Sequence, residues 1–408
     1  MRLLLAADEY LPHLGGVQRV ILETSRRLQA RGHQVTILTF ERDLSLPRQG
    51  EVAGVAVQRI PLSGKLSTYS CALVGSRQAF RQLWHTRPSD SLHIHQPLIG
   101  AGVFLDGNTR RPPIVHTFYG PWHKEMAAEL GMKPLKAPLR TLYGLYIAML
   151  SAGLKAWQGQ LMQRCDRIMV LSECSRRQIA AIFAATNAHR VAIVPGGVDT
   201  QRFHPSPDRV AVRARLGLPL DRRILLTVRR LVPRMGLENL LKAFARLSLE
   251  ESDLYLVIGG RGRLEGVLRA LVEQLGIVER VRFVGFVSEE ELPAYYQAAD
   301  LFVLPTVALE GFGLIILEAL ASGLPVVGTS VGAIPEILGQ FDPRFLTSDA
   351  DAESLGKGMR RGLAIVREEG SALAQRCRAF AVAGYDWERI VDRYEALYAG
   401  LFERTDVV

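Results

Sequence analysis

Short apolar runs alternate with longer amphipathic segments along the first half of the chain. Arg2 to Ala7 is an apolar run of strand length, Val17 to Arg31 has the periodicity of a helix, and Gln34 to Phe40 returns to strand. Further strands are predicted at residues 55–60, 92–95, 114–117, 166–172 and 191–195. Strands that alternate with helices build a mostly parallel sheet with helices on both faces, so the pattern predicts an α/β fold.

The alternation restarts after a glycine-rich, proline-bounded segment, Pro195 to Pro205, which we interpret as a linker. Strands are predicted beyond it at residues 224–229, 254–258, 281–284, 301–304 and 325–328. A length of 408 residues exceeds what one hydrophobic core usually serves. We therefore predict two doubly wound domains, 1–198 and 199–386, followed by an amphipathic helix at 387–402.

The most informative stretch, EGFGLIILEALASGLPVV, begins at Glu310. Its glycine loop follows a predicted strand and precedes a predicted helix, Leu314 to Ala321. Backbone N–H groups at a helix N-terminus suit a phosphate group, and the carboxylates of Glu310 and Glu318 can accept hydrogen bonds from sugar hydroxyls. Chance spacing is the alternative explanation in a chain with 41 acidic residues.

Two other strand ends carry candidate anion-binding groups. Arg229, Arg230 and Arg234 follow the first strand of the second half, where they either bind an anionic ligand or merely solvate the strand end. Gly15 and Gly16 stand at the first turn of the chain, where a double glycine permits close approach of a bound anion. The turn lacks the G-x-G-x-x-G spacing, so NAD is not expected.

The two glutamates in this setting resemble the E-x7-E marker of family 4 of the retaining glycosyltransferases. The resemblance covers nearly the whole chain, most specifically residues 195–340. It implies the GT-B fold, in which two Rossmann-like domains face each other across a cleft. Residues 1–198 would bind the acceptor and 199–386 the nucleotide sugar, with helix 387–402 packing back on the first domain.

The resemblance implies that a sugar moves with retention from a nucleoside diphosphate to an acceptor hydroxyl, in the synthesis of a glycan or glycoconjugate. Glu310 would contact the donor sugar, Glu318 the ribose and Arg230 the diphosphate, which Gly16 would approach closely. The loop amides would hold the sugar and diphosphate; they belong to Gly311, Phe312, Gly313 and Leu314. No metal ion or other cofactor is expected, because the nucleotide sugar is a substrate.

The chain departs from the family pattern at two positions. Met235 stands where the family has a phosphate-binding lysine, so we expect Arg234 to supply the second positive charge. Tyr119 stands where a histidine usually reaches the transferring sugar, and either Tyr119 or the nearby His116 takes that role. Two alternatives stay open: a phosphorylase with the same fold, and a non-catalytic nucleotide-sugar-binding relative, which the two departures would support.

Positive charge is concentrated in the first half. Residues 1–198 hold 24 basic and 12 acidic residues, a net charge of +12, whereas the remainder has a net charge of −3. The stretch from Leu130 to Cys165 has no acidic residue and contains Tyr143, Tyr146 and Trp157. Such a segment either lies on an anionic membrane or buries its apolar face in the core, and we favour the core.

Four scattered cysteines without a C-x-x-C pair indicate a reducing compartment. No apolar run approaches the roughly 20 residues that a spanning helix needs. We therefore expect a cytoplasmic protein, with peripheral attachment to the inner face of a membrane left open. The expected partners are a nucleotide sugar and a glycan, lipid-linked or small-molecule acceptor, and not nucleic acid. His93 and His95 share one face of a predicted strand, and we interpret them as buried histidines rather than metal ligands.

Overall fold

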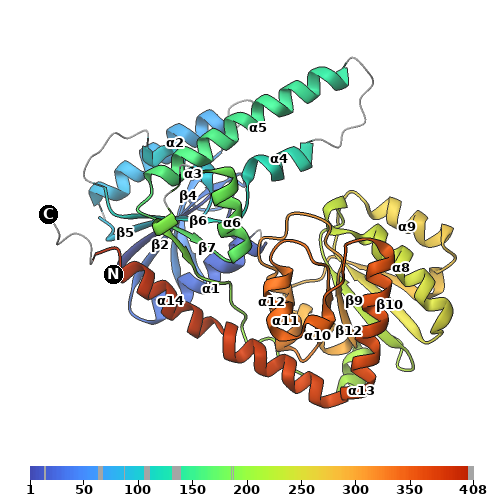
Figure 1. Ribbon diagram of the computed structural model, residues 1–408. Helices are drawn as coiled ribbons and strands as arrows, with labels where there is room; N and C mark the ends of the chain where they lie inside the picture. The colour runs from blue at the N-terminus through green and yellow to red at the C-terminus, as the bar shows by residue number, and fades with distance from the viewer. Residues whose placement is uncertain are drawn as a thin grey trace. The chain divides into compact units, whose positions relative to one another are not determined.

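The computed structural model describes residues 1–402 except 13–14, 63–67, 87, 105–110, 131–138, 185 and 187. The chain divides into two compact units (Figure 1). Unit 1 comprises Met1–Pro195 and Ile390–Val408, and unit 2 comprises Gly196–Arg389. The boundary after Pro195 falls in the glycine-rich segment that the sequence indicated as a linker.

Unit 1 is built on an eight-stranded sheet in the order β3-β4-β2-β1-β5-β6-β7-β8, in which only the β3–β4 pairing is antiparallel. Its central strands β1, β5 and β6 are buried along almost their whole length, because helices cover both faces of the sheet. The strands are β1 (Arg2–Ala7), β2 (Gln34–Glu41), β3 (Gln49–Val52), β4 (Val55–Pro61), β5 (Ser91–Ile94), β6 (Ile114–Phe118), β7 (Arg167–Val170) and β8 (Val191–Ile193).

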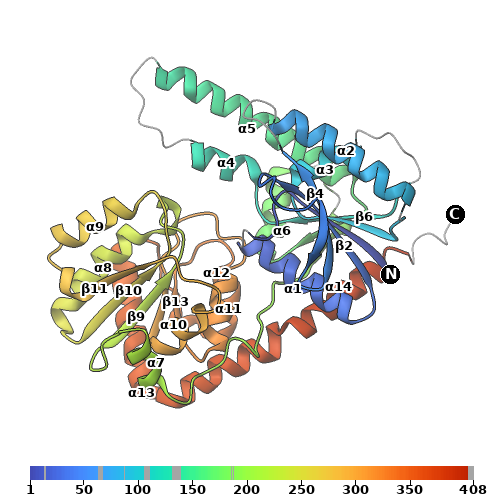
Figure 2. The same cartoon turned by 180° about the vertical axis from the view of Figure 1, so that it is seen from behind.

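The helices of unit 1 lie on the two faces of this sheet (Figures 1 and 2). Helices α2, α3 and α5 share one apolar core cluster with β1, β2, β5 and β6. On the opposite face α1 meets the C-terminal helix α14, where Arg31 pairs with Asp392 and Glu395 at 2.6 and 2.7 Å. The helices are α1 (Gly16–Ala30), α2 (Thr68–Thr86), α3 (Pro97–Phe104), α4 (Trp122–Leu130), α5 (Leu139–Arg164), α6 (Glu173–Ile182) and α14 (Trp387–Ala399).

Unit 2 contains a parallel five-stranded sheet in the order β11-β10-β9-β12-β13. Its strands are β9 (Arg223–Val228), β10 (Leu254–Gly259), β11 (Val281–Gly285), β12 (Leu301–Leu304) and β13 (Val326–Gly328). Its helices are α7 (Arg209–Arg215), α8 (Leu237–Glu250), α9 (Glu265–Gln274), α10 (Leu292–Ala298), α11 (Leu314–Ala321), α12 (Ile334–Phe341) and α13 (Ala352–Tyr385). The helix predicted at Leu314 to Ala321 is confirmed at both ends.

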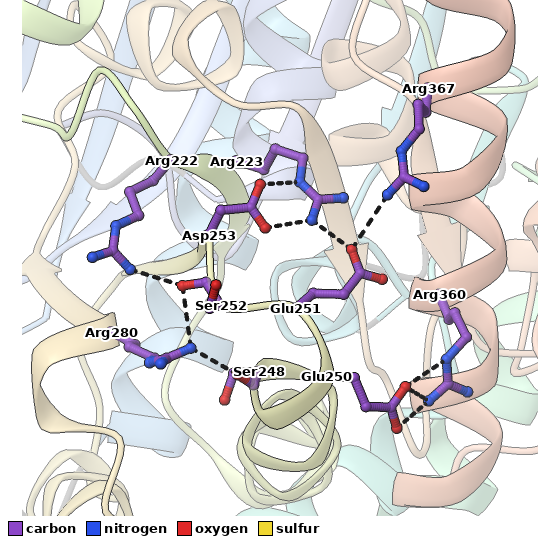
Figure 3. A network of polar contacts seen from close by, with 10 residues as sticks. All are labelled: Arg222, Arg223, Ser248, Glu250, Glu251, Ser252, Asp253, Arg280, Arg360 and Arg367. Carbon is purple, nitrogen blue, oxygen red and sulfur yellow. Dashed lines mark hydrogen bonds and ion pairs between the residues drawn. The ribbon is translucent and has the colours of Figure 1, made fainter.

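A cluster of ion pairs and hydrogen bonds lies at the amino-terminal edge of this sheet (Figure 3). Arg223, at the start of β9, forms a two-pronged ion pair with Asp253 and also reaches Glu251, which Arg367 of α13 approaches at 3.5 Å. The Arg223 guanidinium holds the pKa of Asp253 below its usual value. The amino edge is thus occupied by structural ion pairs, and the candidate ligand-binding groups stand at the opposite, carboxyl edge, where ligands of parallel sheets usually bind.

None of the helices in the described part of the chain combines the length and the apolar character that crossing a membrane requires.

Candidate active site

Glu310 is held by an ion pair with Arg229, the residue that directly follows β9. Nη2 of Arg229 donates to Oε2 of Glu310 at 2.7 Å, and Nη1 donates to the hydroxyl of Thr306. The Thr306 hydroxyl in turn donates to the same Oε2 atom at 3.3 Å. The Arg229 and Glu310 side chains are only 6% and 14% exposed. A pair so withdrawn from water fixes the orientation of the carboxylate more firmly than a surface ion pair would.

Arg234 is hydrogen-bonded to the loop that carries Glu310. Its Nη1 atom donates to the carbonyl of Leu309 at 2.9 Å, and its own carbonyl accepts the Val307 amide at 3.0 Å. Leu309 has a positive φ of 58°, a conformation that costs a non-glycine residue about 1–3 kcal/mol. Arg234 therefore supports a strained turn immediately before Glu310, in addition to bringing a positive charge to this edge.

Two glycines let backbone segments meet closely around this loop. Gly236 has a φ of 71°, and a Cβ there would lie 1.8 Å from the carbonyl oxygen of Pro305. Gly332 has a φ of 60°, and a Cβ there would lie 2.1 Å from the carbonyl oxygen of Glu310. Neither position can carry a side chain without moving the backbone of Pro305 or of Glu310.

The glycine loop ends at the N-terminus of α11. Gly313, with a φ of 92°, is the N-cap of this helix, and Leu314 is its first residue. The first amides of a helix have no partner within it, so they form a donor set at the carboxyl edge of the sheet. Gly311 and Phe312 precede them, and Phe312 is buried. The structure thus places the predicted phosphate-binding backbone directly beside the loop of Glu310.

Glu318 lies one turn into α11 and is oriented by a buried tyrosine. The hydroxyl of Tyr296, on α10, donates to Oε2 of Glu318 at 2.9 Å. Tyr296 itself packs edge-on against Phe203 and Phe302, with ring centroids 5.8 and 5.6 Å apart. Rigid packing beneath the tyrosine therefore restricts the carboxylate that would bind a ribose.

Of the two alternatives for the three arginines, solvation of the strand end does not describe Arg229, whose side chain is buried in the pair with Glu310. Arg230 is exposed at the same strand end. Sequence reasoning missed the supporting roles of Arg229, Thr306 and Tyr296. Arg229 is separated from Thr306 and Glu310 by 77 and 81 residues, so no local pattern could have identified these contacts.

Gly16 is the first residue of α1 in unit 1, and Gly15 is its N-cap. A Cβ at Gly16 would meet no atom of the described residues within 4 Å, apart from its two chain neighbours and its own helix. Neighbouring residues therefore do not require glycine there.

The predicted residues His116 and Tyr119 belong to a buried histidine and tyrosine cluster. His95 is hydrogen-bonded to the hydroxyl of Tyr119 at 2.8 Å, and Nδ1 of His116 donates to the carbonyl of Ile94 at 2.9 Å. His93 stacks on His95 and is hydrogen-bonded to Tyr398 of α14 at 2.7 Å and to Thr117 at 2.6 Å. His93 is thus a satisfied buried histidine, as the sequence indicated.

Two ring nitrogens of this cluster, Nε2 of His95 and Nε2 of His116, are buried without a hydrogen-bond partner among the residues that the structure describes. Burial lowers the pKa of His95 to about 3 and that of His116 to about 4, and it lowers the pKa of His93 well below its usual value. All three rings are therefore neutral at pH 7. Within the described ranges, no three His, Cys, Asp or Glu side chains gather as metal ligands.

Acid is expected to destabilise unit 1 through these histidines. The unfolded chain takes up their protons near pH 6.5, whereas the folded chain resists protonation down to about pH 4, so stability is lost as the pH falls through this window. Between pH 7.5 and 5.5 the free energy of unfolding should fall by about 1 kcal/mol for each histidine. Urea unfolding followed by tryptophan fluorescence measures it, because Trp84, Trp122 and Trp157 all lie in unit 1.

His93→Gln should remove about a third of this pH dependence, and His189→Gln, at an exposed position, should leave it unchanged. An unfolding free energy that is equal at the two pH values would contradict the prediction.

Sequence profiles of two families match the chain. "Glycosyltransferase Family 4" matches residues 14–202, and "Glycosyl transferases group 1" matches residues 208–379. The D-inositol 3-phosphate glycosyltransferases of Mycobacterium avium and Geodermatophilus obscurus are similar in sequence. They are 30% and 31% identical, over 94% and 95% of this chain and 88% and 85% of theirs.

Sucrose-phosphate synthase from Thermosynechococcus elongatus has a similar structure, with a TM-score of 0.80 over 99% of this chain and 100% of that chain at 23% identity. Anabaena HepE in complex with UDP-glucose aligns with a TM-score of 0.74 over 98% of this chain and 100% of that chain at 16% identity. These structures share the two-unit α/β architecture. The family profiles, the curated relatives and the fold agree: the chain belongs to the family 4 glycosyltransferases and has the GT-B fold.

Proposed function

We propose that this glycosyltransferase transfers a sugar, with retention of configuration, from a nucleoside diphosphate to an acceptor hydroxyl. The main support for the proposal is a group of hydrogen-bonded residues at the carboxyl edge of the unit 2 sheet. It runs from Arg229 through Glu310 to the loop fastened by Arg234, and the N-terminus of α11 follows directly. At such an edge, cations and backbone amides can bind a diphosphate, and carboxylates can accept hydrogen bonds from sugar hydroxyls.

Each group has a distinct role in this proposal. Glu310 accepts hydrogen bonds from the donor sugar, and Glu318 binds the ribose. Arg230, Arg234 and the amides from Gly311 to Leu314 hold the diphosphate, which Gly16 of unit 1 approaches. Unit 2 accordingly binds the nucleotide sugar and unit 1 binds the acceptor.

In the reaction, the bond between the sugar C1 and the diphosphate oxygen breaks while the acceptor oxygen bonds to C1. Negative charge develops on the leaving diphosphate, where Arg230, Arg234 and the helix amides stabilise it. The departing phosphate oxygen takes the proton of the acceptor hydroxyl on the same face of the sugar. Glu310 is a poor candidate for a covalent nucleophile, because its carboxylate is already paired with Arg229.

Either His116, within β6, or Tyr119, directly after β6, contacts the transferring sugar in this proposal. His116 is a neutral ring with an unpartnered Nε2 atom among the described residues, whereas the hydroxyl of Tyr119 is bonded to His95. Both groups are therefore suited to hydrogen bonding rather than to carrying a charge.

The decisive experiment is a panel of UDP-, GDP- and ADP-sugars scored first by thermal shift and then by turnover. UDP-glucose belongs in it because Anabaena HepE was crystallised with that compound, and D-inositol 3-phosphate belongs among the acceptors because of the curated relatives. NMR of the product reports the anomeric configuration, and retention is expected. Breakdown that requires inorganic phosphate and no nucleotide would indicate a phosphorylase, and donor binding without turnover would indicate a non-catalytic relative.

Glu318→Ala is expected to weaken binding of the nucleoside diphosphate by about 1–3 kcal/mol, the cost of lost hydrogen bonds to a charged group. Calorimetry with UDP, GDP and ADP measures the change. Glu265→Ala is the matched control, because Glu265 pairs with Arg269 on the surface of α9 in the same unit. Equal affinities in Glu318→Ala and the wild-type protein would remove Glu318 from the ribose site.

Transfer is expected to continue in the presence of EDTA. The positive charge that the diphosphate requires comes from Arg230, Arg234 and the N-terminus of α11 in this proposal, which together perform the work that a metal ion does in other transferases. Turnover measured with and without EDTA tests the point. Complete loss of activity that Mg²⁺ or Mn²⁺ restores would show that a metal ion takes part.

A further inference from the structure

The outward face of α5 carries an apolar stripe that the other residues described in unit 1 leave exposed. Four large apolar side chains on the first half of the helix are exposed by more than half: Leu142 (63%), Leu145 (58%), Tyr146 (55%) and Met149 (76%). Their spacing of i, i+3, i+4 and i+7 places them on one side of a helix. The expectation that the apolar face of this segment lies in the core is therefore wrong for this half of α5.

The stripe is distinct from the face by which α5 is anchored. Leu154, Gln158 and Leu161 are buried, and Leu161 belongs to the core cluster with α2 and α3. On the outward side the stripe ends where the same face becomes polar, at Gln160, Gln163 and Arg164. The exposed stripe is therefore confined to the first half of a helix whose second half is an ordinary amphipathic core helix.

We propose that the stripe formed by Leu142, Leu145, Tyr146 and Met149 is an attachment surface for an anionic lipid bilayer. The residues from Leu130 to Cys165 include five basic and no acidic residues, and residues 1–198 have a net charge of +12. A helix that combines an exposed apolar stripe with a basic, acid-free sequence is suited to the boundary between lipid headgroups and acyl chains. Tyr146, which stacks against Tyr143 at 6.2 Å, has the apolar ring and polar tip that favour this boundary.

The same charge distribution disfavours a second copy of the chain as the occupant. Two α5 helices that covered each other's stripes would bring together two basic, acid-free segments, and like charges repel at short distance. An anionic bilayer has the complementary charge, and each basic residue near its surface adds about 1 kcal/mol of attraction. Attachment of this kind would bring the enzyme to acceptors carried on lipid.

The test is flotation of the full-length protein with vesicles of phosphatidylcholine alone or mixed with phosphatidylglycerol. Binding should require phosphatidylglycerol and fall steeply between 50 and 500 mM salt. The double variant Leu145→Ser/Met149→Ser should lower the partition coefficient about tenfold or more, since two apolar side chains leave the lipid. Lys155→Gln should lower it by about fivefold.

Leu249→Ser is the matched control, because Leu249 is 87% exposed on α8 of the other unit, and it should bind vesicles like the wild-type protein. All variants change exposed side chains, so thermal midpoints and nucleotide binding should remain those of the wild-type protein. Vesicle binding needs no donor, so its outcome is independent of the proposed catalytic function.

Three results would overturn the proposal. The first is equal flotation of the double variant and the wild-type protein, and the second is no flotation of the wild-type protein at low salt. The third is a dimer that forms without lipid in sedimentation velocity and that the double variant fails to form. That result would assign the stripe to a second copy of this chain.

Discussion

Arg234→Ala is expected to lower kcat by about 10²–10³-fold, the range for removing one group that stabilises charge in a transition state. Met235 cannot take this role, because a thioether is only a weak acceptor and its side chain is buried. The loss should appear mainly in kcat rather than KM, because charge on the diphosphate grows as the sugar departs. Steady-state kinetics with the donor identified by the panel measure both constants.

The contact between Arg234 and the carbonyl of Leu309 adds a structural component to this loss. Met235→Lys in the Arg234→Ala background separates the two contributions. The lysine stem can occupy the methionine site while the ammonium group reaches outward, so charge is restored without the contact to Leu309. The part of kcat that is recovered measures the contribution of the positive charge. The part that is still missing measures the contribution of the hydrogen bond from Arg234 to the loop.

Arg222→Ala is the matched control for Arg234→Ala. Arg222 also donates to a backbone carbonyl, that of Ser252, but at the opposite edge of the same sheet (Figure 3). Its loss should leave kcat unchanged. An Arg234→Ala enzyme with wild-type kcat and KM would leave Arg230 and the helix amides as the whole diphosphate clamp.

Arg229→Met is expected to destabilise unit 2 by about 3–5 kcal/mol, because it leaves the carboxylate of Glu310 withdrawn from water without its cation. Turnover should also fall, because the carboxylate that contacts the donor sugar loses its orientation. Urea unfolding followed by circular dichroism measures the first effect, and kcat measures the second.

The double variant Arg229→Met/Glu310→Gln distinguishes structure from chemistry. It removes both charges, so it should recover much of the stability, whereas kcat should stay low because the donor sugar has lost its carboxylate. Arg269→Met, which breaks the exposed pair with Glu265, should change neither quantity measurably. Wild-type stability and kcat in Arg229→Met would show that the pair neither supports the fold nor positions Glu310.

The sequence by itself determined the elements of the fold and the local part of the site. Alternating apolar runs and amphipathic segments predicted two α/β units, because the periodicity of buried positions is a property of neighbouring residues. The helix from Leu314 to Ala321 follows from the glycine loop before it and Gly323 after it. The same stretch contains Glu310 and Glu318, so the motif and its setting could be identified together.

Tertiary structure alone decided which polar side chains support that motif. Arg229 pairs with Glu310, 81 residues away, because β9 and β12 are neighbours in the sheet. His93 is satisfied by Tyr398, 305 residues away, for the same kind of reason. The sequence of α5 favoured a core face, whereas the first half of the helix presents its apolar residues outward. Burial depends on which elements pack against a helix, and those elements come from distant parts of the chain.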